Sequence, residues 1–367
     1  MAGKPRVPWD LSEIIPLSIP KGVKKLCELC EKPAHLQCTK CRLTFYCGTE
    51  HQQADWVGIH DRICQLLVPI RSPAPFYSLQ ADRDTHRIQT RIKQEQLVEI
   101  SRAVAQSKLF EGKYMEVQPA AQFFLRCATD IFGPGVVQLV PAYLLLAESS
   151  VGLGSLSQAK RFMSAAEWVV LRSPDCGPAV RHQLHRSLGR LYTMMGNLDA
   201  ALLHFANDVY YASEEYGLDN TVTCDGYFLM ANVFIQKGER LIAHSLYSEV
   251  ARTWHSHLTK LFESLKQNST SLEPSFDKSQ RAEVDQMLRT ILEAGENNSI
   301  QNKSQIALVA HCLAMLWFLG GDPQKALEFG SRALQASQLI PHHDLTEPIQ
   351  SLLQLVQTGL RPDTDTS

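Results

Sequence analysis

The stretch CELCEKPAHLQCTKCRLTFYCGTEHQQADWVGIHDRIC, residues 27–64, determines how the N-terminal part of this 367-residue chain folds. It holds six of the ten cysteines and three of the thirteen histidines. Eight of these side chains form four close pairs: Cys27 with Cys30, Cys38 with Cys41, Cys47 with His51, and His60 with Cys64. Two tetrahedral zinc ions need eight such ligands at this spacing. The sequence therefore predicts a site for two zinc ions.

Ordinary buried cysteines or a set of disulfides are the alternatives to zinc. Residues 1–26 lack the long apolar segment of a secretory signal, so the sequence does not indicate an oxidising compartment. Four pairs at ligand spacing favour zinc. Because 38 residues cannot bury enough apolar surface to fold alone, we expect the metal ions to supply much of the folding free energy of this segment.

The segment resembles a MYND-type zinc finger. The likeness rests on the four ligand pairs, the step Phe45-Tyr46-Cys47 and the step Gln52-x3-Trp56. In that family the first and third pairs hold one zinc ion, and the second and fourth pairs hold the other. The resemblance implies a first site of Cys27, Cys30, Cys47 and His51 and a second site of Cys38, Cys41, His60 and Cys64.

Two features depart from the family pattern. His51 stands where the family usually has cysteine, and one extra residue separates Trp56 from His60. Imidazole is an ordinary zinc ligand, so a site of three cysteines and one histidine is chemically sound. A water molecule or His35 is the alternative fourth ligand of the first site. The i, i+4 spacing of His60 and Cys64 still places both on one face of a helix.

A second pattern covers most of the remaining chain. Four glycines lie 42 residues apart, and a small residue precedes each by seven positions: Ala105 and Gly112, Ala147 and Gly154, Gly189 and Gly196, Ala231 and Gly238. Small residues allow two helices to cross closely, and glycine ends the first of them. The pattern resembles long tetratricopeptide repeats, with a late copy around Gly321 and a weak first copy in which Val117 replaces a small residue.

The two patterns together predict a mainly α-helical protein with a small two-zinc finger before an α-solenoid. We expect residues 256–300 to be either a decayed repeat or an insertion, with a helix at 279–294 that carries Val284, Met287, Leu288 and Ile291 on one face. The predicted order is an irregular leader at 1–22, the finger at 23–66, a linker at 67–83 with Phe76 and Tyr77 docked on the next unit, the repeats at 84–345, a capping helix at 346–360 and a polar tail at 361–367.

Composition and motifs limit the class of function. The chain has 36 basic and 38 acidic residues, so it lacks the clustered positive charge of a general nucleic-acid binder. No apolar run reaches 18 residues, so we expect no transmembrane helix. Because residues 1–26 lack a secretory signal, we also expect a protein of a reducing compartment. MYND fingers also occur in SET-type methyltransferases, but the chain is predicted helical from residue 84 and contains no phosphate-binding loop or nucleophile motif. We expect no enzymatic activity.

Two protein-binding sites are expected instead. The resemblance to MYND fingers implies a groove at Gln52 and Trp56 that accepts short proline-containing peptides. On the inner face of the repeats, Arg186, Arg190 and Asn232 are candidates to clamp an acidic or C-terminal segment. Solvated arginines and a structural tryptophan are the alternatives.

The order of a MYND finger and long tetratricopeptide repeats resembles a ciliary member of the MYND-containing proteins. The steps that carry this likeness are Ala54-Asp55-Trp56, Cys64-Gln65-Leu66-Leu67, residues 139–147 and Ala206-Asn207-Asp208. The resemblance implies a cytoplasmic scaffold of the ciliary or flagellar axoneme that works with dynein-associated proteins and another tetratricopeptide protein. The alternative is a nuclear or cytoplasmic adaptor that recruits proline-motif proteins to a regulatory complex.

Overall fold

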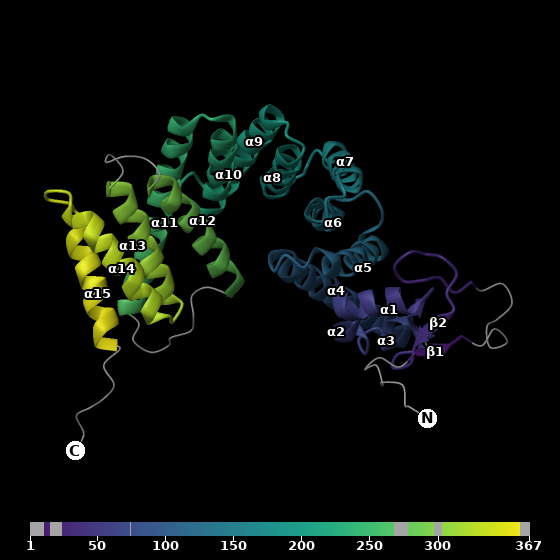
Figure 1. The fold of residues 1–367 in the computed structure, drawn as a ribbon. Helices are drawn as coiled ribbons and strands as arrows, with labels where there is room; N and C mark the ends of the chain where they lie inside the picture. The colour runs from purple at the N-terminus through teal and green to yellow at the C-terminus, as the bar shows by residue number, and fades with distance from the viewer. Residues whose placement is uncertain (1–10, 15–23, 74, 268–277, 297–302, 360–367) are drawn as a thin grey trace, which may run out of the picture. The chain divides into compact units, whose positions relative to one another are not determined.

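The computed structural model describes residues 11–14, 24–73, 75–267, 278–296 and 303–359 (Figure 1). The described chain is mainly helical and divides into two compact units, Met1–Ser187 and Leu188–Ser367. The boundary falls inside one helix, α8 (Pro178–Met194). The prediction of a small finger before a mainly helical, repeat-like body is confirmed at this level.

The finger contains a small antiparallel sheet. Its three strands, in spatial order, are β1 (Leu11–Glu13), β2 (Leu36–Cys38) and β3 (Phe45–Tyr46). Leu11 pairs with Cys38, and Leu36 pairs with Tyr46. The expectation of an irregular leader at 1–22 is wrong for Leu11–Glu13, because these residues extend the sheet of the finger. Residues 1–10 and 15–22 lie outside the described residues.

Three consecutive helical segments carry the last ligands of the finger. They are α1 (Thr49–Asp55), η2, a π-helix (Trp56–His60), and α2 (Asp61–Ile63). The N–H of Asp61 donates to the carbonyl of Trp56, five residues earlier, so this turn holds one residue more than an α-turn. The extra residue between Trp56 and His60 is accommodated here. The next turn is ordinary, since Cys64 N–H donates to His60 O at 2.8 Å.

The finger shares a core with the first helices of the body. Ile59, Ile63 and Leu67 are each at most 2 % exposed and pack with apolar residues of the next two long helices. The first unit continues with α3 (Val68–Arg71), α4 (Gln80–Phe110), α5 (Tyr114–Phe132), η3 (Val137–Leu139), α6 (Val140–Gly152) and α7 (Leu156–Arg172). The segment predicted as a linker at 67–83 thus contains a short helix and the start of α4. Within it, the ring of Tyr77 contacts that of His86, but Phe76 is 94 % exposed and does not dock as expected.

Gly58 marks the closest approach of the finger to α5. A Cβ atom on Gly58 would lie 2.7 Å from Cβ of Pro119 and 3.2 Å from the carbonyl oxygen of Glu116. Both distances are shorter than normal carbon contacts. The absence of a side chain at Gly58 is therefore what lets the π-helix lie directly on α5.

The second unit consists of helices packed mainly against their neighbours in sequence (Figure 1). After α8 these are α9 (Leu198–Tyr216), α10 (Thr221–Lys237), α11 (Arg240–Gln267), α12 (Lys278–Glu296), α13 (Lys303–Leu319), α14 (Pro323–Gln338) and α15 (Thr346–Gly359). The helix α15 lies where the capping helix is predicted. The predicted tail at 361–367 lies outside the described residues.

The spaced glycines share one backbone conformation. Gly112, Gly154, Gly196, Gly238 and Gly321 have φ angles between +70° and +84°. In each case the N–H of the following residue donates to a carbonyl five residues before it, as Asn197 does to Tyr192 O at 3.0 Å. This left-handed cap ends the first helix of each pair and satisfies carbonyls that would otherwise lack partners.

The small residues of the pattern lie where paired helices meet. Ala105, Ala147 and Ala231 are fully buried, and so is Val117, which replaces a small residue in the first copy. A Cβ on Gly189 would lie 2.4 Å from the ring of Phe205. Close crossing therefore requires small side chains at these positions, and a large residue on the facing helix fills the space.

The region between Gly238 and Gly321 departs from the pairing. In its described parts, 240–267, 278–296 and 303–319, it contains three helices, whereas two full pairs would need four. Helix α12 matches the helix predicted at 279–294, and Val284, Met287, Leu288 and Ile291 are all at most 5 % exposed. It packs on α13. Residues 268–277, which belong to the predicted decayed repeat or insertion at 256–300, lie outside the described residues.

We predict that Gly58→Ala lowers the stability of the first unit by about 1–3 kcal/mol, because the new methyl group overlaps Pro119. At an unobstructed helical position the same change would stabilise by up to about 1 kcal/mol. Urea unfolding with hydrogen exchange of α5 measures the loss. Gly295→Ala is the matched control, because Gly295 lies within a helix, α12, and a Cβ there meets only Ile306, at an ordinary contact distance of 3.5 Å. Unchanged or higher stability of the Gly58 variant would contradict the proposed packing.

Candidate metal centre and protein-binding surfaces

The first group of ligand atoms comes from the loop before β2 and from the start of α1. It consists of Cys27, Cys30, Cys47 and His51, whose ligand atoms all lie within 4.8 Å of one another. The Sγ atoms of Cys30 and Cys47 are 3.6 Å apart. Nδ1 of His51 lies 3.4 Å from Sγ of Cys27 and 3.2 Å from Sγ of Cys47. His51 therefore occupies the fourth position, while His35 is not part of the group.

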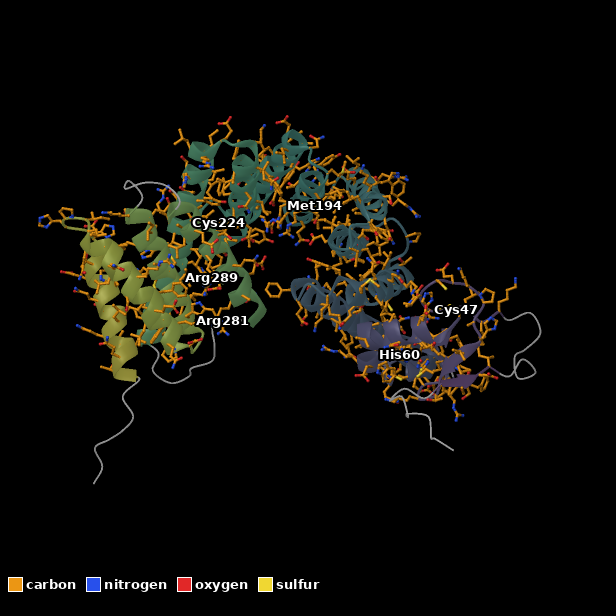
Figure 2. The ribbon with its side chains drawn as sticks, in the orientation of Figure 1. Cys47, His60, Met194, Cys224, Arg281 and Arg289 are labelled. Carbon is orange, nitrogen blue, oxygen red and sulfur yellow. The ribbon has the colours of Figure 1, made fainter. Side chains whose placement is uncertain are left out.

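The second group is buried. Cys38, Cys41, His60 and Cys64 again place their ligand atoms within 4.8 Å of one another, and each residue is at most 7 % exposed. Sγ of Cys38 lies 3.9 Å from Sγ of Cys64, and Sγ of Cys41 lies 3.6 Å from Nε2 of His60. Figure 2 labels Cys47 of the first group and His60 of the second on the finger.

These distances fit zinc. A tetrahedral ion with Zn–S bonds of about 2.3 Å and Zn–N bonds of about 2.0 Å separates two sulfurs by about 3.8 Å and a sulfur from a nitrogen by about 3.5 Å. The observed separations of 3.2–3.9 Å agree with this geometry. A disulfide would need about 2.05 Å between sulfurs, and all ten cysteines are free. The two cross-braced groups fit two Zn²⁺ ions, each held by three thiolates and one imidazole.

Zinc binds the thiolate form of cysteine, and the local structure favours this form at only half of the six cysteine ligands. The thiol pKa is lowered at Cys27, Cys30 and Cys41, whereas burial and the neighbouring cysteines raise it at Cys38, Cys47 and Cys64. Burial opposes ionisation of Cys27, but the backbone N–H groups of Cys47, Cys30 and Leu29 outweigh it and lower the pKa of this thiol. In the second group, hydrogen bonds from Cys38 and His60 lower the pKa of Cys41 to about 3.

A carboxylate orients the histidine of the second group. Oδ2 of Asp55 lies 3.7 Å from Nδ1 of His60, the ring nitrogen that points away from the ligand set. Asp55 is 1 % exposed and accepts a hydrogen bond of 2.7 Å from the hydroxyl of Tyr46. Burial raises the pKa of Asp55 to about 6, while His60 and Tyr46 oppose this shift. The order metal–imidazole–carboxylate fixes the ring orientation of a zinc-binding histidine. The sequence analysis did not identify this role of Asp55.

A second charged cluster ties the first zinc group to the helical body. Glu28, between Cys27 and Cys30, accepts hydrogen bonds from Arg71 at 2.7 and 3.1 Å and from Arg126 of α5 at 2.8 Å. Burial opposes the charge of Glu28, but the two guanidinium groups hold its pKa below the ordinary value. The partners are 43 and 98 residues away, so no local pattern in the sequence predicts the cluster.

The two residues expected to form the finger groove, Gln52 and Trp56, differ in their exposure to solvent. Gln52 is 1 % exposed, and within the described chain neither atom of its amide has a hydrogen-bond partner. Its predicted role as a surface amide for a bound peptide does not fit this burial. Trp56 is half-buried, borders a cavity of about 370 Å³ with Asp61 and Lys108, and lies under the ammonium group of Lys40 at 4.3 Å. A role for Trp56 in peptide binding stays a prediction.

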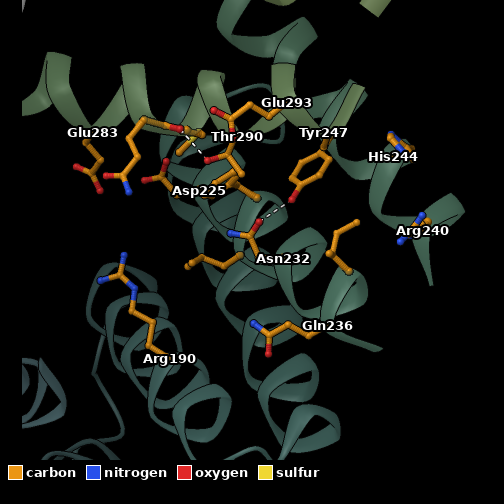
Figure 3. A pocket seen from close by; sticks show the side chains of 16 residues that line it. Arg190, Asp225, Asn232, Gln236, Arg240, His244, Tyr247, Glu283, Thr290 and Glu293 are labelled. Carbon is orange, nitrogen blue, oxygen red and sulfur yellow. Dashed lines mark hydrogen bonds between the residues drawn. The ribbon is translucent and has the colours of Figure 1, made fainter. Parts of the chain in front are cut away.

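The second unit brings two of the three predicted clamp residues to one cavity. Figure 3 shows Arg190 of α8 and Asn232 of α10 on the wall of this cavity, whose volume is about 820 Å³. The amide oxygen of Asn232 accepts a hydrogen bond of 2.6 Å from the hydroxyl of Tyr247. Arg186 is not part of the wall. Sequence reasoning also missed its other charged residues: Asp225, Arg240, Glu283 and Glu293.

The comparison with protein families agrees with the geometry of the finger. The family model of the MYND finger matches residues 27–64. Residues 27–64 are a MYND finger. Within the described residues, no helix is long and apolar enough to cross a membrane.

Curated proteins that resemble this chain match a short stretch of it. Egl nine homolog 1 from Mus musculus is 43 % identical over 61 residues, which are 16 % of this chain and 15 % of that protein. Tudor domain-containing protein 1 from Danio rerio is 38 % identical over 47 residues, 13 % of this chain and 4 % of that protein. The chain thus spans a small fraction of these relatives. The solved structure of BtubC (BKLC) from P. vanneervenii covers 74 % of this chain and 96 % of its own, with 16 % identity and a TM-score of 0.31, which is too low to support an argument.

We predict that the purified protein carries two zinc ions per chain, because two complete ligand groups are present. Metal analysis by mass spectrometry after dialysis measures the ratio. His51→Ala should lower it toward one, because the first group keeps only three ligands. His35→Ala is the control, since this exposed histidine belongs to neither group. A ratio near one for the unaltered chain would contradict the two-site structure.

We predict that Asp55→Asn weakens zinc binding at the second site by about 10–100-fold, because His60 loses the carboxylate that orients its ring. Competition with a chromogenic chelator resolves the release of the two ions. Glu50→Gln is the matched control, because Glu50 is an exposed acid on the same helix, α1. Equal affinities for the two variants would show that Asp55 does not support the metal site.

Proposed function

We propose that this protein is a non-enzymatic scaffold that binds other proteins, mainly through its helical body and secondarily through its finger. The observation that supports this best is the cavity formed by α8, α10, α11 and α12 (Figure 3). Its wall combines arginine, carboxylate and amide side chains with the apolar residues Phe228, Leu229 and Ile235. Such a mixture suits a protein segment, because charged groups determine its register and apolar groups supply affinity.

The mixed charge changes the expected partner. Arg190 and Arg240 favour an acidic group, whereas Asp225, Glu283 and Glu293 favour a basic one. A segment that carries both signs of charge fits the wall better than the acidic or C-terminal segment expected from the sequence. Binding by Arg190 and Asn232 still belongs to this proposal, and Arg186 has no part in it.

We further propose that the helix pairs are long tetratricopeptide repeats. The 42-residue spacing of four glycines, their shared left-handed caps and the buried small residues at the helix crossings support this assignment. Each pair then adds one strip to an extended binding surface, as in other repeat proteins.

The cellular location and the partners are the most specific part of the proposal. The order of finger and repeats resembles zinc finger MYND domain-containing protein 12. We propose on this resemblance that the chain is an axonemal component, with dynein-associated proteins and another tetratricopeptide protein as partners. The second candidate function is a nuclear or cytoplasmic adaptor for proline-motif proteins. It is supported by the cavity that half-buried Trp56 borders, where a proline-containing peptide could bind. We propose no catalytic step for either.

The test is affinity purification of the tagged full-length protein from multiciliated cells, together with imaging of the tag. The full chain is needed because the finger shares its core with α4 and α5. Arg190→Glu should reduce recovery of the main partners at least about tenfold, because it reverses the charge of a cavity residue. Arg186→Glu, one turn earlier on the same helix, is the matched control. Equal recovery with both variants would contradict the cavity, and a nuclear signal would favour the adaptor.

A further inference from the structure

A separate groove lies in the first unit, between residues 69–73 and 75–77 on one side and the N-terminal half of α4 on the other. Its volume is about 800 Å³. None of the zinc ligands or the residues of the proposed protein-binding cavity contributes to it. Its lining residues are Pro69, Ile70, Ser72, Pro75, Phe76, Tyr77, Arg83, His86, Arg87, Thr90, Arg91 and Gln94.

The α4 side of the groove is basic. Arg83, Arg87 and Arg91 are four residues apart, so they form one row along the helix with a spacing of about 6 Å and a length of about 12 Å. His86, Thr90 and Gln94 form the neighbouring row. No aspartate or glutamate belongs to the lining of this groove.

Contacts within the protein leave much of this charge available. Arg91 donates to Glu95 at 2.8 Å and to the carbonyl of Ile131 at 2.9 Å, so it is partly neutralised. Arg83 makes one long contact of 3.4 Å to the carbonyl of Ser78. Arg87 is exposed and has no hydrogen-bond or ion-pair partner among the described residues.

Three acidic residues, Asp82, Asp84 and Glu95, lie on the same stretch of α4 as the row. Asp82 and Asp84 lie on the same helix but not in the lining, and Asp84 accepts a hydrogen bond from Gln80 at 3.0 Å. Glu95 is engaged by Arg91. The excess positive charge is therefore concentrated at Arg83 and Arg87.

The opposite side of the groove is largely apolar. Pro69, Ile70, Pro75 and Phe76 lie there, and Phe76 is 94 % exposed. The rings of Tyr77 and His86 are in tilted contact, with 5.2 Å between the ring centroids, and this contact joins the two sides. Exposed proline and phenylalanine next to a row of arginines suit a ligand that has carboxylates on one side and an apolar side chain on the other.

We propose that this groove binds an acidic peptide segment of a partner protein, with the carboxylates of the segment on Arg83 and Arg87 and an apolar side chain against Phe76. Guanidinium groups bind carboxylates through two parallel hydrogen bonds. In an extended peptide, alternate residues lie about 6.6 Å apart on one side, which is close to the spacing of the arginine row. This site is independent of the proposed function, because it shares no residue with the finger ligands or the cavity of the second unit.

A nucleic acid fits this groove less well. A row of about 12 Å meets only a few phosphates, and the whole chain has a net charge of −2. Base stacking would need an open aromatic face, whereas the ring of Tyr77 is in tilted contact with His86 and its hydroxyl lies 3.3 Å from Nδ1 of that residue. The exposed ring of Phe76 could contact either a peptide side chain or a base, so the experiment tests both a peptide and a nucleic acid.

The experiment measures fluorescence anisotropy of labelled octaglutamate, and of a version with one central glutamate replaced by leucine, with the zinc-loaded full-length protein. We expect the leucine version to bind more tightly and both to weaken with added salt. The double variant Arg83→Glu with Arg87→Glu should weaken binding of both peptides at least about tenfold. Lys160→Glu with Arg161→Glu is the matched control, because it makes the same charge change at exposed positions of the same unit.

Three other results would overturn the proposal. Equal loss in the control variant would show non-specific attraction. Loss in Arg190→Glu but not in the groove variant would place acidic-peptide binding in the second unit. Tighter binding of a labelled octathymidine would indicate a nucleic-acid site. Helical circular dichroism and zinc content of each variant, measured beforehand, exclude misfolding as the cause of lost binding.

Discussion

The structure of the N-terminal part depends on one constraint, the meeting of eight thiol and imidazole groups in two tetrahedral sets. The strands of the finger are two or three residues long, and such strands do not form a stable sheet by their own hydrogen bonds. The sets interleave, because the first joins residues 27–30 to 47–51 and the second joins 38–41 to 60–64. Metal coordination thus fixes the path of the chain, and the short strands follow it.

The finger and the helical body are not independent. The π-helix that ends at the zinc ligand His60 also contains Gly58, which lies on Pro119 of α5. Glu28, between two ligands of the other zinc, is held by Arg71 and Arg126. The same short segments therefore bind metal and contact helices, so loss of zinc should weaken α4 and α5 as well as the finger.

Local patterns predicted much of this architecture. The ligand pairs indicated two zinc ions, and the periodic apolar residues indicated α12, because both signals depend on residues close in sequence. Three features were outside the reach of such patterns. Strand β1 pairs with residues about 25 positions away, Glu28 meets Arg126 across 98 residues, and the role of Asp55 follows from the side of His60 that it faces. Long-range contacts and side-chain orientation require the fold.

The packing of the finger limits the surface that it presents. Gln52 is buried, and the ammonium group of Lys40, another finger residue, lies over the ring of Trp56, so the finger presents less of a groove than the sequence predicts. The exposed, chemically varied surfaces lie instead on helices, at the cavity of α8, α10, α11 and α12 and along the first half of α4. One surface carries charges of both signs and the other carries arginines with an apolar edge. If both surfaces bind proteins, as proposed, their different charge selects different partners, which is the property that a scaffold needs in order to hold two proteins at once.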